Sequence, residues 1–218
     1  MDPRPALLDL IATLSFRLGD FTLSSGQKSD YYIDCRITTL HAEGGRLSGI
    51  VLLDLIREHF PQAVAIGGLT MGADPLVSNT ASASAWELAD HNEFQELDPG
   101  EDHGPTPTLI HGFLVRKSEK AHGTGRRVEG FLQPGANVVI VDDVCTTGGS
   151  TITAIEATRE AGMNVIGVLC LVDREQGGRE QIERALTEIP TSNDAPSPRF
   201  FSVFTASDVR KAHIGLQR

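Results

Sequence analysis

Short apolar runs rich in β-branched residues alternate along the chain with longer segments whose apolar residues recur at helical spacing. The short runs predict buried strands, followed by an edge strand near the carboxyl end, at residues 63–66, 109–115, 138–141, 165–172 and 200–204. The longer segments predict helices at residues 5–18, 46–60 and 181–189, and one more from Ile152 to Ala161. This alternation predicts an α/β fold with a central, mostly parallel sheet flanked by helices.

Two segments depart from the alternation. Residues 21–34 join two β-forming stretches through a glycine-centred turn, which predicts a hairpin. Residues 87–108 mix carboxylates with proline and glycine, which indicates a mobile acidic surface insertion. We assign it no function.

Length and composition limit the possible classes of protein. The chain has 218 residues, 40% of them hydrophobic, which suits a single domain over residues 1–218. We find no membrane-spanning run and no signal-peptide pattern, so a cytoplasmic location is expected. The net charge of -10 argues against nucleic acid or an anionic membrane as the main partner.

The most informative stretch is Val138 to Thr151, which reads VVIVDDVCTTGGST. An apolar strand leads into the pair Asp142 and Asp143, and then into a loop of small and hydroxyl residues that opens a helix. Glycine-rich loops at helix N-termini bind phosphate through backbone N–H groups, whereas the carboxylates suit neutral hydroxyls. The order of these groups predicts a ribose 5-phosphate ligand. An ordinary strand-to-helix turn would explain the valines but not the acid pair.

This stretch resembles the phosphoribosyl pyrophosphate (PRPP) motif of the type I phosphoribosyltransferases. By that resemblance, Asp142 and Asp143 hold the ribose diol and the following loop holds the 5′-phosphate. The glycine-rich turn at residues 67–75 resembles the family's pyrophosphate loop, with Thr70-Met71 where many relatives carry Tyr-Lys. The basic segment at residues 116–125 resembles the mobile catalytic loop. A solubilising basic loop is the alternative there.

The resemblance implies two sets of site residues. PRPP would be bound by Thr70, Met71, Arg116, Lys117, Lys120, His122, Asp142, Asp143, Val144, Cys145, Thr146, Thr147, Gly148, Gly149 and Ser150. Among them Lys120, His122, Asp142 and Asp143 would be catalytic.

Residues 21–33 resemble the amino-terminal hood of the orotate phosphoribosyltransferase family, so residues 1–40 are expected to form a helix and hood. Orotate would then contact Tyr32, Ile33, Lys28, Thr146 and Arg174. The enteric branch of that family carries lysine at the position of Ser24, and the hypothesis here is that Lys28 partly substitutes for it. A solvated turn lysine is the alternative. For Arg174, which would bind the orotate carboxylate, an ion pair with Asp173 is the alternative.

The implied reaction joins orotate to PRPP, giving orotidine 5′-monophosphate and pyrophosphate in pyrimidine biosynthesis. The resemblance implies Mg²⁺ as cofactor, held mainly by PRPP and water, and a homodimer in which Lys117 reaches the partner's site. Two alternatives stay open: a phosphoribosyltransferase for another nucleobase, and a PRPP-sensing regulator with a degenerate transferase fold.

Overall fold

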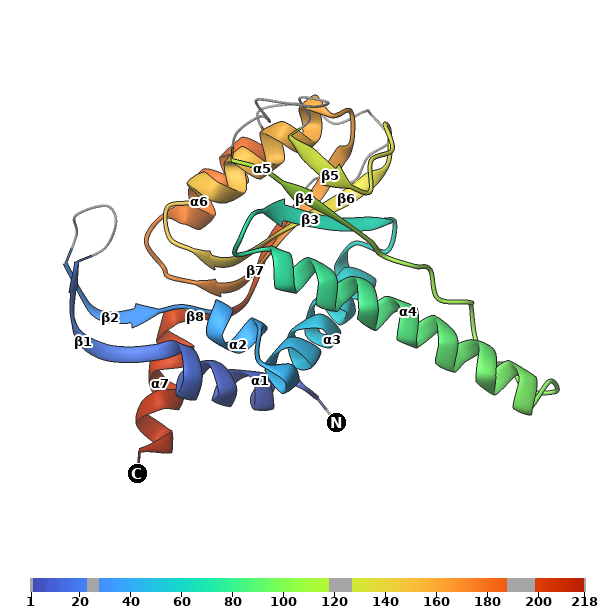
Figure 1. The fold of residues 1–218 in the computed structure, drawn as a ribbon, viewed down its shortest axis with the longest axis horizontal. Helices are drawn as coiled ribbons and strands as arrows, with labels where there is room; N and C mark the ends of the chain where they lie inside the picture. Colours follow the sequence, from blue (N-terminus) through green and yellow to red (C-terminus); the bar gives the residue numbers. More distant parts are fainter. Residues whose placement is uncertain (1, 23–27, 118–126, 188–198, 218) are drawn as a thin grey trace.

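The computed structural model describes residues 2–22, 28–117, 127–187 and 199–217 (Figure 1). Within these ranges a six-stranded sheet has the order β5-β4-β3-β6-β7-β8. Its strands are β3 (Ala65–Leu69), β4 (His111–Val115), β5 (Val128–Gly130), β6 (Asn137–Cys145), β7 (Asn164–Asp173) and β8 (Arg199–Thr205). All neighbours pair in parallel except β4 and β5. The expected mostly parallel sheet is confirmed, with β8 at an edge as predicted.

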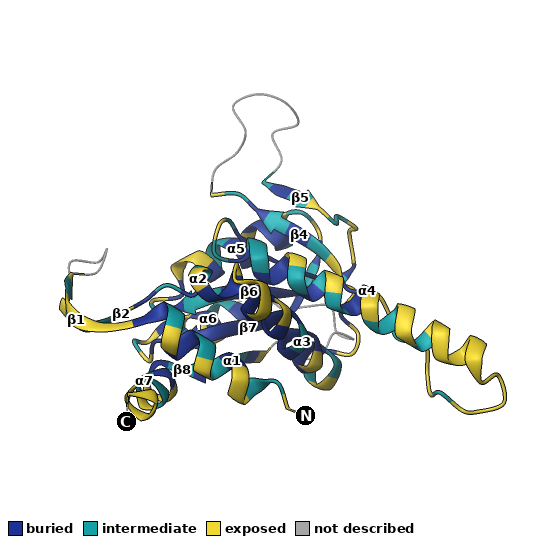
Figure 2. Ribbon diagram, turned by 60° about the horizontal axis from the view of Figure 1, so that its bottom comes forward, coloured by how far each residue is buried: buried dark blue, intermediate teal, exposed yellow. Residues whose placement is uncertain are grey.

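Helices cover both faces of this sheet (Figures 1 and 2). One hydrophobic cluster includes residues of α1 (Arg4–Leu10), α3 (Ala42–His59), α4 (Asp74–Leu97) and α7 (Ala206–Leu216). The other includes residues of α5 (Gly149–Glu160) and α6 (Gly178–Thr187). Successive residues of β6 alternate between the clusters, since Val139 and Val141 join the first while Val138 and Ile140 join the second. Burial on both faces explains the uninterrupted valine and isoleucine run.

The amino-terminal helix is shorter than the pattern predicts. After α1 the chain makes a wider helical turn, η1 (Ile11–Ser15), and then enters strand β1 (Phe16–Thr22). This strand pairs antiparallel with β2 (Lys28–Ile33), and Phe16 stacks on Tyr31. The helix predicted to Leu18 therefore ends earlier, because pairing and ring packing draw Phe16 into the hairpin. We call β1 and β2 together the hood.

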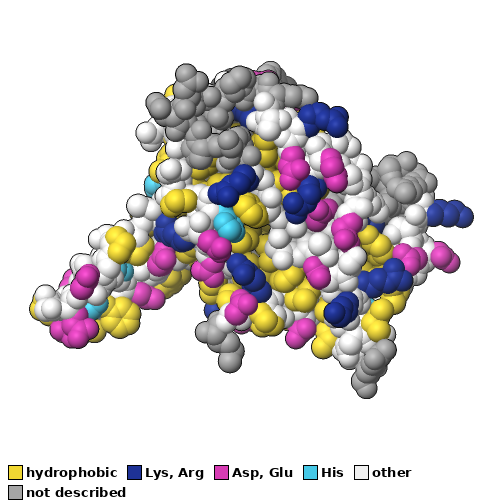
Figure 3. All heavy atoms as spheres, turned by 180° about the vertical axis from the view of Figure 1, so that it is seen from behind, with side chains coloured by type: hydrophobic (Ala, Val, Ile, Leu, Met, Phe, Trp, Pro, Cys, Tyr) yellow, Lys and Arg dark blue, Asp and Glu magenta, His cyan; other side chains and the backbone are white. Residues whose placement is uncertain are grey.

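The acidic stretch at residues 87–108 differs from the expected irregular insertion. Its first half, to Leu97, continues helix α4, which is 24 residues long. The far end of α4 projects from the body, where hydrophobic and acidic side chains lie side by side (Figure 3). Trp86, Phe94 and Leu97 are all more than half exposed there. Helix-forming Glu, Ala and Leu residues without an internal proline extend the helix until Pro99.

Element ends differ from the predictions by a few residues. Strand β6 continues through Asp142 and Asp143 instead of ending before them. Helix α4 starts at Asp74, directly after the glycine-rich turn. At the start of α7 the cap is Thr205, which forms a reciprocal capping box with Asp208. None of the described helices is long and apolar enough to cross a membrane.

Candidate active site

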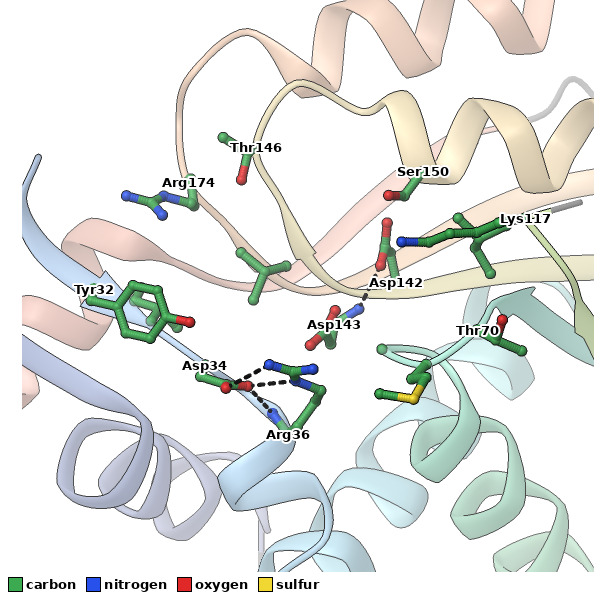
Figure 4. A pocket seen from close by; sticks show the side chains of 15 residues that line it. Tyr32, Asp34, Arg36, Thr70, Lys117, Asp142, Asp143, Thr146, Ser150 and Arg174 are labelled. Atoms are coloured by element: carbon green, nitrogen blue, oxygen red, sulfur yellow. Dashed lines mark hydrogen bonds and ion pairs between the residues drawn. The ribbon is translucent and has the colours of Figure 1, made fainter. Parts of the chain in front are cut away.

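A cavity of about 610 Å³ opens at the carboxyl ends of the central strands, beside the hood (Figure 4). Parallel α/β sheets bind ligands at this edge. The following predicted site residues line the cavity: Tyr32, Ile33, Thr70, Met71, Lys117, Asp142, Asp143, Val144, Thr146, Ser150 and Arg174. Segments far apart in the sequence thus meet around one space large enough for a nucleotide-sized ligand.

The acid pair lies on the floor of this cavity. Asp142 is only 8% exposed, and its carboxylate accepts hydrogen bonds from the Thr151 hydroxyl at 2.7 Å and the Asp143 N–H at 3.0 Å. Burial, reinforced by the neighbouring Asp143 charge, raises the pKa of Asp142 to about 7. Burial also raises the pKa of Asp143, with the backbone N–H of Val144 opposing it. A buried carboxylate beside a half-buried one favours a ligand that supplies hydroxyl donors or a cation.

The loop after the acid pair has the geometry of an anion site. Gly148 has a φ of 79°, a left-handed conformation that glycine adopts without strain, and α5 starts at Gly149. The first N–H groups of a helix have no partner within it, and here they lie next to the exposed Thr147 and Ser150 hydroxyls. The sequence therefore builds a set of converging donors at this end of the cavity.

Cys145 differs from its neighbours in this loop. Its side chain is fully buried, and its carbonyl accepts the N–H of Arg174 at 2.9 Å. Cys145 does not line the cavity and its thiol packs into the core, so the predicted contact of Cys145 with PRPP is not supported by this placement. The bond to Arg174 ties the loop to the next strand-to-helix turn.

The glycine-rich turn after β3 packs directly against the acid pair. A methyl group on Gly72 would overlap the Asp143 carboxylate, so only glycine allows this approach. Thr70 and Met71 border the same cavity, and Met71 is 66% exposed. The turn offers backbone amides and no cationic side chain.

Arg174 connects the cavity to the hood. Its guanidinium lies 4.7 Å from the ring centre of Tyr31 and donates to the Ser29 hydroxyl at 3.3 Å. Its buried Nε has no acceptor among the described residues. Asp173 instead accepts the Glu175 N–H and pairs with Arg179 at 3.6 Å. The alternative of an Asp173 pair is therefore wrong, and Arg174 keeps a donor for a planar anion.

Other predicted residues lie elsewhere. Arg116 pairs with Glu129 at 3.2 Å and, like Thr147, Gly148 and Gly149, is not among the described residues lining the cavity. Lys117 lines the cavity of its own chain, whereas the resemblance implied a role in the partner's site. Lys120 and His122 lie outside the described residues.

Lys28 is not brought to the cavity. It opens β2 and borders a separate hollow with Asp20 and Phe21. Four residues of extended strand, about 13 Å, separate it from Tyr32. The expected contact of Lys28 with orotate is therefore not supported by this placement.

Sequence reasoning missed Asp34 and Arg36, which also line the cavity. Arg36 donates through Nε and Nη2 to the two Asp34 oxygens, each at 2.8 Å (Figure 4). The sequence signal was present, since an acid and a cation two residues apart directly follow a β-forming stretch.

The donor set fits Mg²⁺ only in part. Among the described residues no group of three or more His, Cys, Asp or Glu side chains could hold a metal ion. The buried pair Asp142 and Asp143 nevertheless suits an ion that arrives with water and phosphate oxygens, as Mg²⁺ does.

Comparisons with known proteins agree with this geometry. The family model described as a phosphoribosyl transferase domain matches residues 100–197. The chain is 44% identical over 182 residues to the orotate phosphoribosyltransferase of Streptomyces avermitilis, covering 84% of this chain and 88% of that protein. It is 40% identical over 212 residues to that of Synechocystis sp., covering 96% and 90%.

A solved structure is similar over nearly its whole length. The Mycobacterium tuberculosis H37Rv orotate phosphoribosyltransferase in complex with PRPP has a TM-score of 0.67 and 30% identity, covering 95% of this chain and 98% of that one. The shared fold, the PRPP motif at the strand ends and the identity over most of the length agree. The chain belongs to the orotate phosphoribosyltransferase family.

Proposed function

We propose that the protein transfers the ribose 5-phosphate group of PRPP to orotate, giving orotidine 5′-monophosphate and pyrophosphate in de novo pyrimidine biosynthesis. The observation that carries the proposal is that one cavity is bordered both by Thr146 and Ser150 of the anion loop and by Arg174. A ribose phosphate on the loop and a planar carboxylate at Arg174 fit the two ends. Uracil and the purine bases lack a carboxylate for this guanidinium.

The reaction needs no protein nucleophile. The N1 nitrogen of orotate gives up its proton to water and forms the bond to the ribose anomeric carbon, and the bond from that carbon to the pyrophosphate oxygen breaks. The residues of this chain orient the reactants: the anion loop holds the 5′-phosphate and the acid pair holds the ribose hydroxyls. Tyr32 and Ile33 at the hood edge flank the base, and Arg174 fixes its carboxylate. Mg²⁺, when bound, neutralises charge on the departing pyrophosphate.

The cationic groups complete this proposal. Lys117 lies at the cavity, where its ammonium stabilises the leaving group. Lys120 and His122 are proposed as transition-state contacts from the resemblance alone. Exclusion of water from the closed site protects the reacting anomeric carbon from hydrolysis.

We also propose a cytoplasmic homodimer. Complementation tests whether Lys117 serves its own site or the partner's. A Lys117→Ala chain is mixed with an Arg174→Ala chain after each is shown to be inactive. Recovered activity in mixed dimers indicates a role across the interface, and no recovery indicates a role within one chain.

The proposed function is tested by incubating the purified protein with PRPP and Mg²⁺ and with orotate, uracil, adenine or xanthine in turn. Product formation with orotate alone is expected, and its loss on adding EDTA supports the role of Mg²⁺. Turnover of another base in preference to orotate favours the alternative transferase. PRPP binding without turnover of any base favours the regulator.

A further inference from the structure

Arg36 is a cavity residue held in a fixed orientation. Arg36 is the first residue of the short helix α2 (Arg36–Thr39), and its guanidinium donates two hydrogen bonds of 2.8 Å to the Asp34 carboxylate. The backbone adds a third hydrogen bond to this pair, because the Arg36 N–H also donates to Asp34 Oδ1 at 3.2 Å. Such a paired arrangement fixes the plane of the guanidinium before any ligand arrives.

The pair with Asp34 leaves other N–H donors of the Arg36 guanidinium free for a ligand. A guanidinium has five N–H donors, and the two bonds to Asp34 use one on Nε and one on Nη2. Among the described residues Nη1 of Arg36 has no hydrogen-bond partner. The side chain is 43% exposed, so these donors are open to a ligand.

The charge of Arg36 acts on the acid pair. Its nearness helps to lower the pKa of Asp143 against the rise caused by burial. Figure 4 shows the guanidinium below Asp143, between that carboxylate and Asp34. An anion that approaches Asp143 therefore meets a compensating positive charge next to it.

Arg36 also lies next to the turn after β3, which carries no cationic side chain. Arg36 and Met71 both border the main cavity and an adjoining hollow of about 530 Å³. The other described cations of the cavity are Lys117, at the end of β4, and Arg174, held by the hood. Among the Lys and Arg residues that the structure describes, Arg36 is thus the one that lines both the main cavity and the adjoining hollow.

We propose that Arg36 binds the pyrophosphate of PRPP and that Asp34 is a positioning residue that holds it in place. The inference rests on the proposed function and deepens it. An anion seated on the amides of Thr70 and Met71 lacks a side-chain cation from the turn itself, and Arg36 supplies one. The alternative is a purely structural pair that joins α2 to the hood.

The test replaces Arg36 by glutamine and titrates the full-length protein with Mg²⁺-pyrophosphate alone and with PRPP. The affinities for Mg²⁺-pyrophosphate and for PRPP are both expected to fall by about 10- to 100-fold, because a charged hydrogen-bond contact is lost. The KM for orotate is expected to change little. Arg36→Lys keeps the charge without the fork and is expected to weaken binding less. Asp34→Asn keeps the Arg36 guanidinium and its charge but loosens its orientation, and this variant is also expected to have a smaller effect than Arg36→Gln.

The matched control is Arg46→Gln. Arg46 forms a similar pair with Glu43 at 2.6 Å on α3, but it does not line the cavity. The control is expected to bind pyrophosphate normally. A second variant, Met71→Lys in the Arg36→Gln background, places an ammonium next to the lost guanidinium and is expected to restore part of the affinity. A structural pair would not be rescued in this way.

Unchanged affinity for pyrophosphate and PRPP in a folded Arg36→Gln variant overturns the inference, as does an equal loss in Arg46→Gln. These outcomes are separable from failure of the proposed function. In that case the wild-type protein would not convert orotate, whereas the pyrophosphate titration measures binding without any base.

Discussion

Gly72 and Asp143 come from different strand ends and touch so closely that no side chain fits between them. The turn that carries Gly72 follows β3, and Asp143 lies on the neighbouring strand β6. The contact sets the distance between the amides of the turn and the acid pair. In the proposed function the turn amides hold the pyrophosphate of PRPP, and the acid pair holds the ribose hydroxyls of the same molecule.

Gly72→Ala is therefore expected to impair PRPP binding. The new methyl group must displace the Asp143 carboxylate or the turn, at a cost of about 1–3 kcal/mol, which corresponds to roughly 5- to 150-fold in affinity. Titration with PRPP and Mg²⁺ measures the change. Gly100→Ala is the control, because nothing lies within 4 Å of the methyl group there. Normal PRPP affinity in Gly72→Ala would show that the spacing is not needed.

Arg174→Lys is expected to act on the base and not on PRPP. A lysine keeps the charge but loses the fork, the Tyr31 stacking and the bond to Ser29. We expect KM for orotate to rise about 10- to 100-fold, with little change for PRPP. Steady-state kinetics with each substrate varied in turn measure both values. The control is Arg179→Lys at the start of α6, whose cation faces Phe200 and Asp173. Equal effects on both substrates would contradict the assignment.

Asp142→Asn is expected to change how stability depends on pH. Folding raises the pKa of Asp142 from 3.8 to about 7, so between these values the unfolded carboxyl releases a proton that the folded one keeps. Stability from this group therefore falls as pH rises through that window and is lowest above it. Asparagine removes the effect, and the variant should gain up to about 4 kcal/mol relative to wild type between pH 4 and pH 8.

Urea unfolding of both proteins at several pH values checks this expectation. The difference between them reports on the coupled pair Asp142 and Asp143, since groups far from this pair titrate alike in both. A difference that stays constant from pH 4 to pH 8 would mean that the pKa of Asp142 is not raised.

Thr151→Val is expected to destabilise the protein by about 1–3 kcal/mol. Valine keeps the shape of threonine but removes the hydroxyl that donates to the buried Asp142 carboxylate. The Thr151 hydroxyl is 2.7 Å from Asp142. Thr153→Val two residues on is the control, since the Thr153 hydroxyl only bonds back to its own helix at Gly149. Thermal unfolding measures both, and equal losses would contradict a special role for Thr151.

The central motif could be predicted well because its signals are local. The run from Val138 to Val141 is buried on both faces of the sheet, and the acid pair and anion loop follow in an order set by the chain itself. The turn before α4 was found in the same way, from its glycines and Pro75. These features depend on backbone conformation more than on distant partners.

The rest depends on tertiary contacts. Phe16 leaves the predicted helix because it stacks on Tyr31 and pairs opposite Ile33. Lys28 lies away from the cavity because of the length of strand between it and Tyr32. Arg36 was overlooked because only the folded hood brings its pair with Asp34 to the acid pair on β6. Spacing in the sequence alone does not predict these tertiary contacts.

The most direct test of the central claim is the ratio of kcat/KM for orotate to that for uracil, measured at saturating PRPP and Mg²⁺ with the product identified by mass. The two bases differ in the carboxylate that Arg174 is proposed to bind. We predict orotidine 5′-monophosphate as the product and a ratio of at least about 100, the discrimination expected when a site built for a charged group meets a ligand that lacks it. A ratio near one, or faster turnover of uracil, would contradict the account.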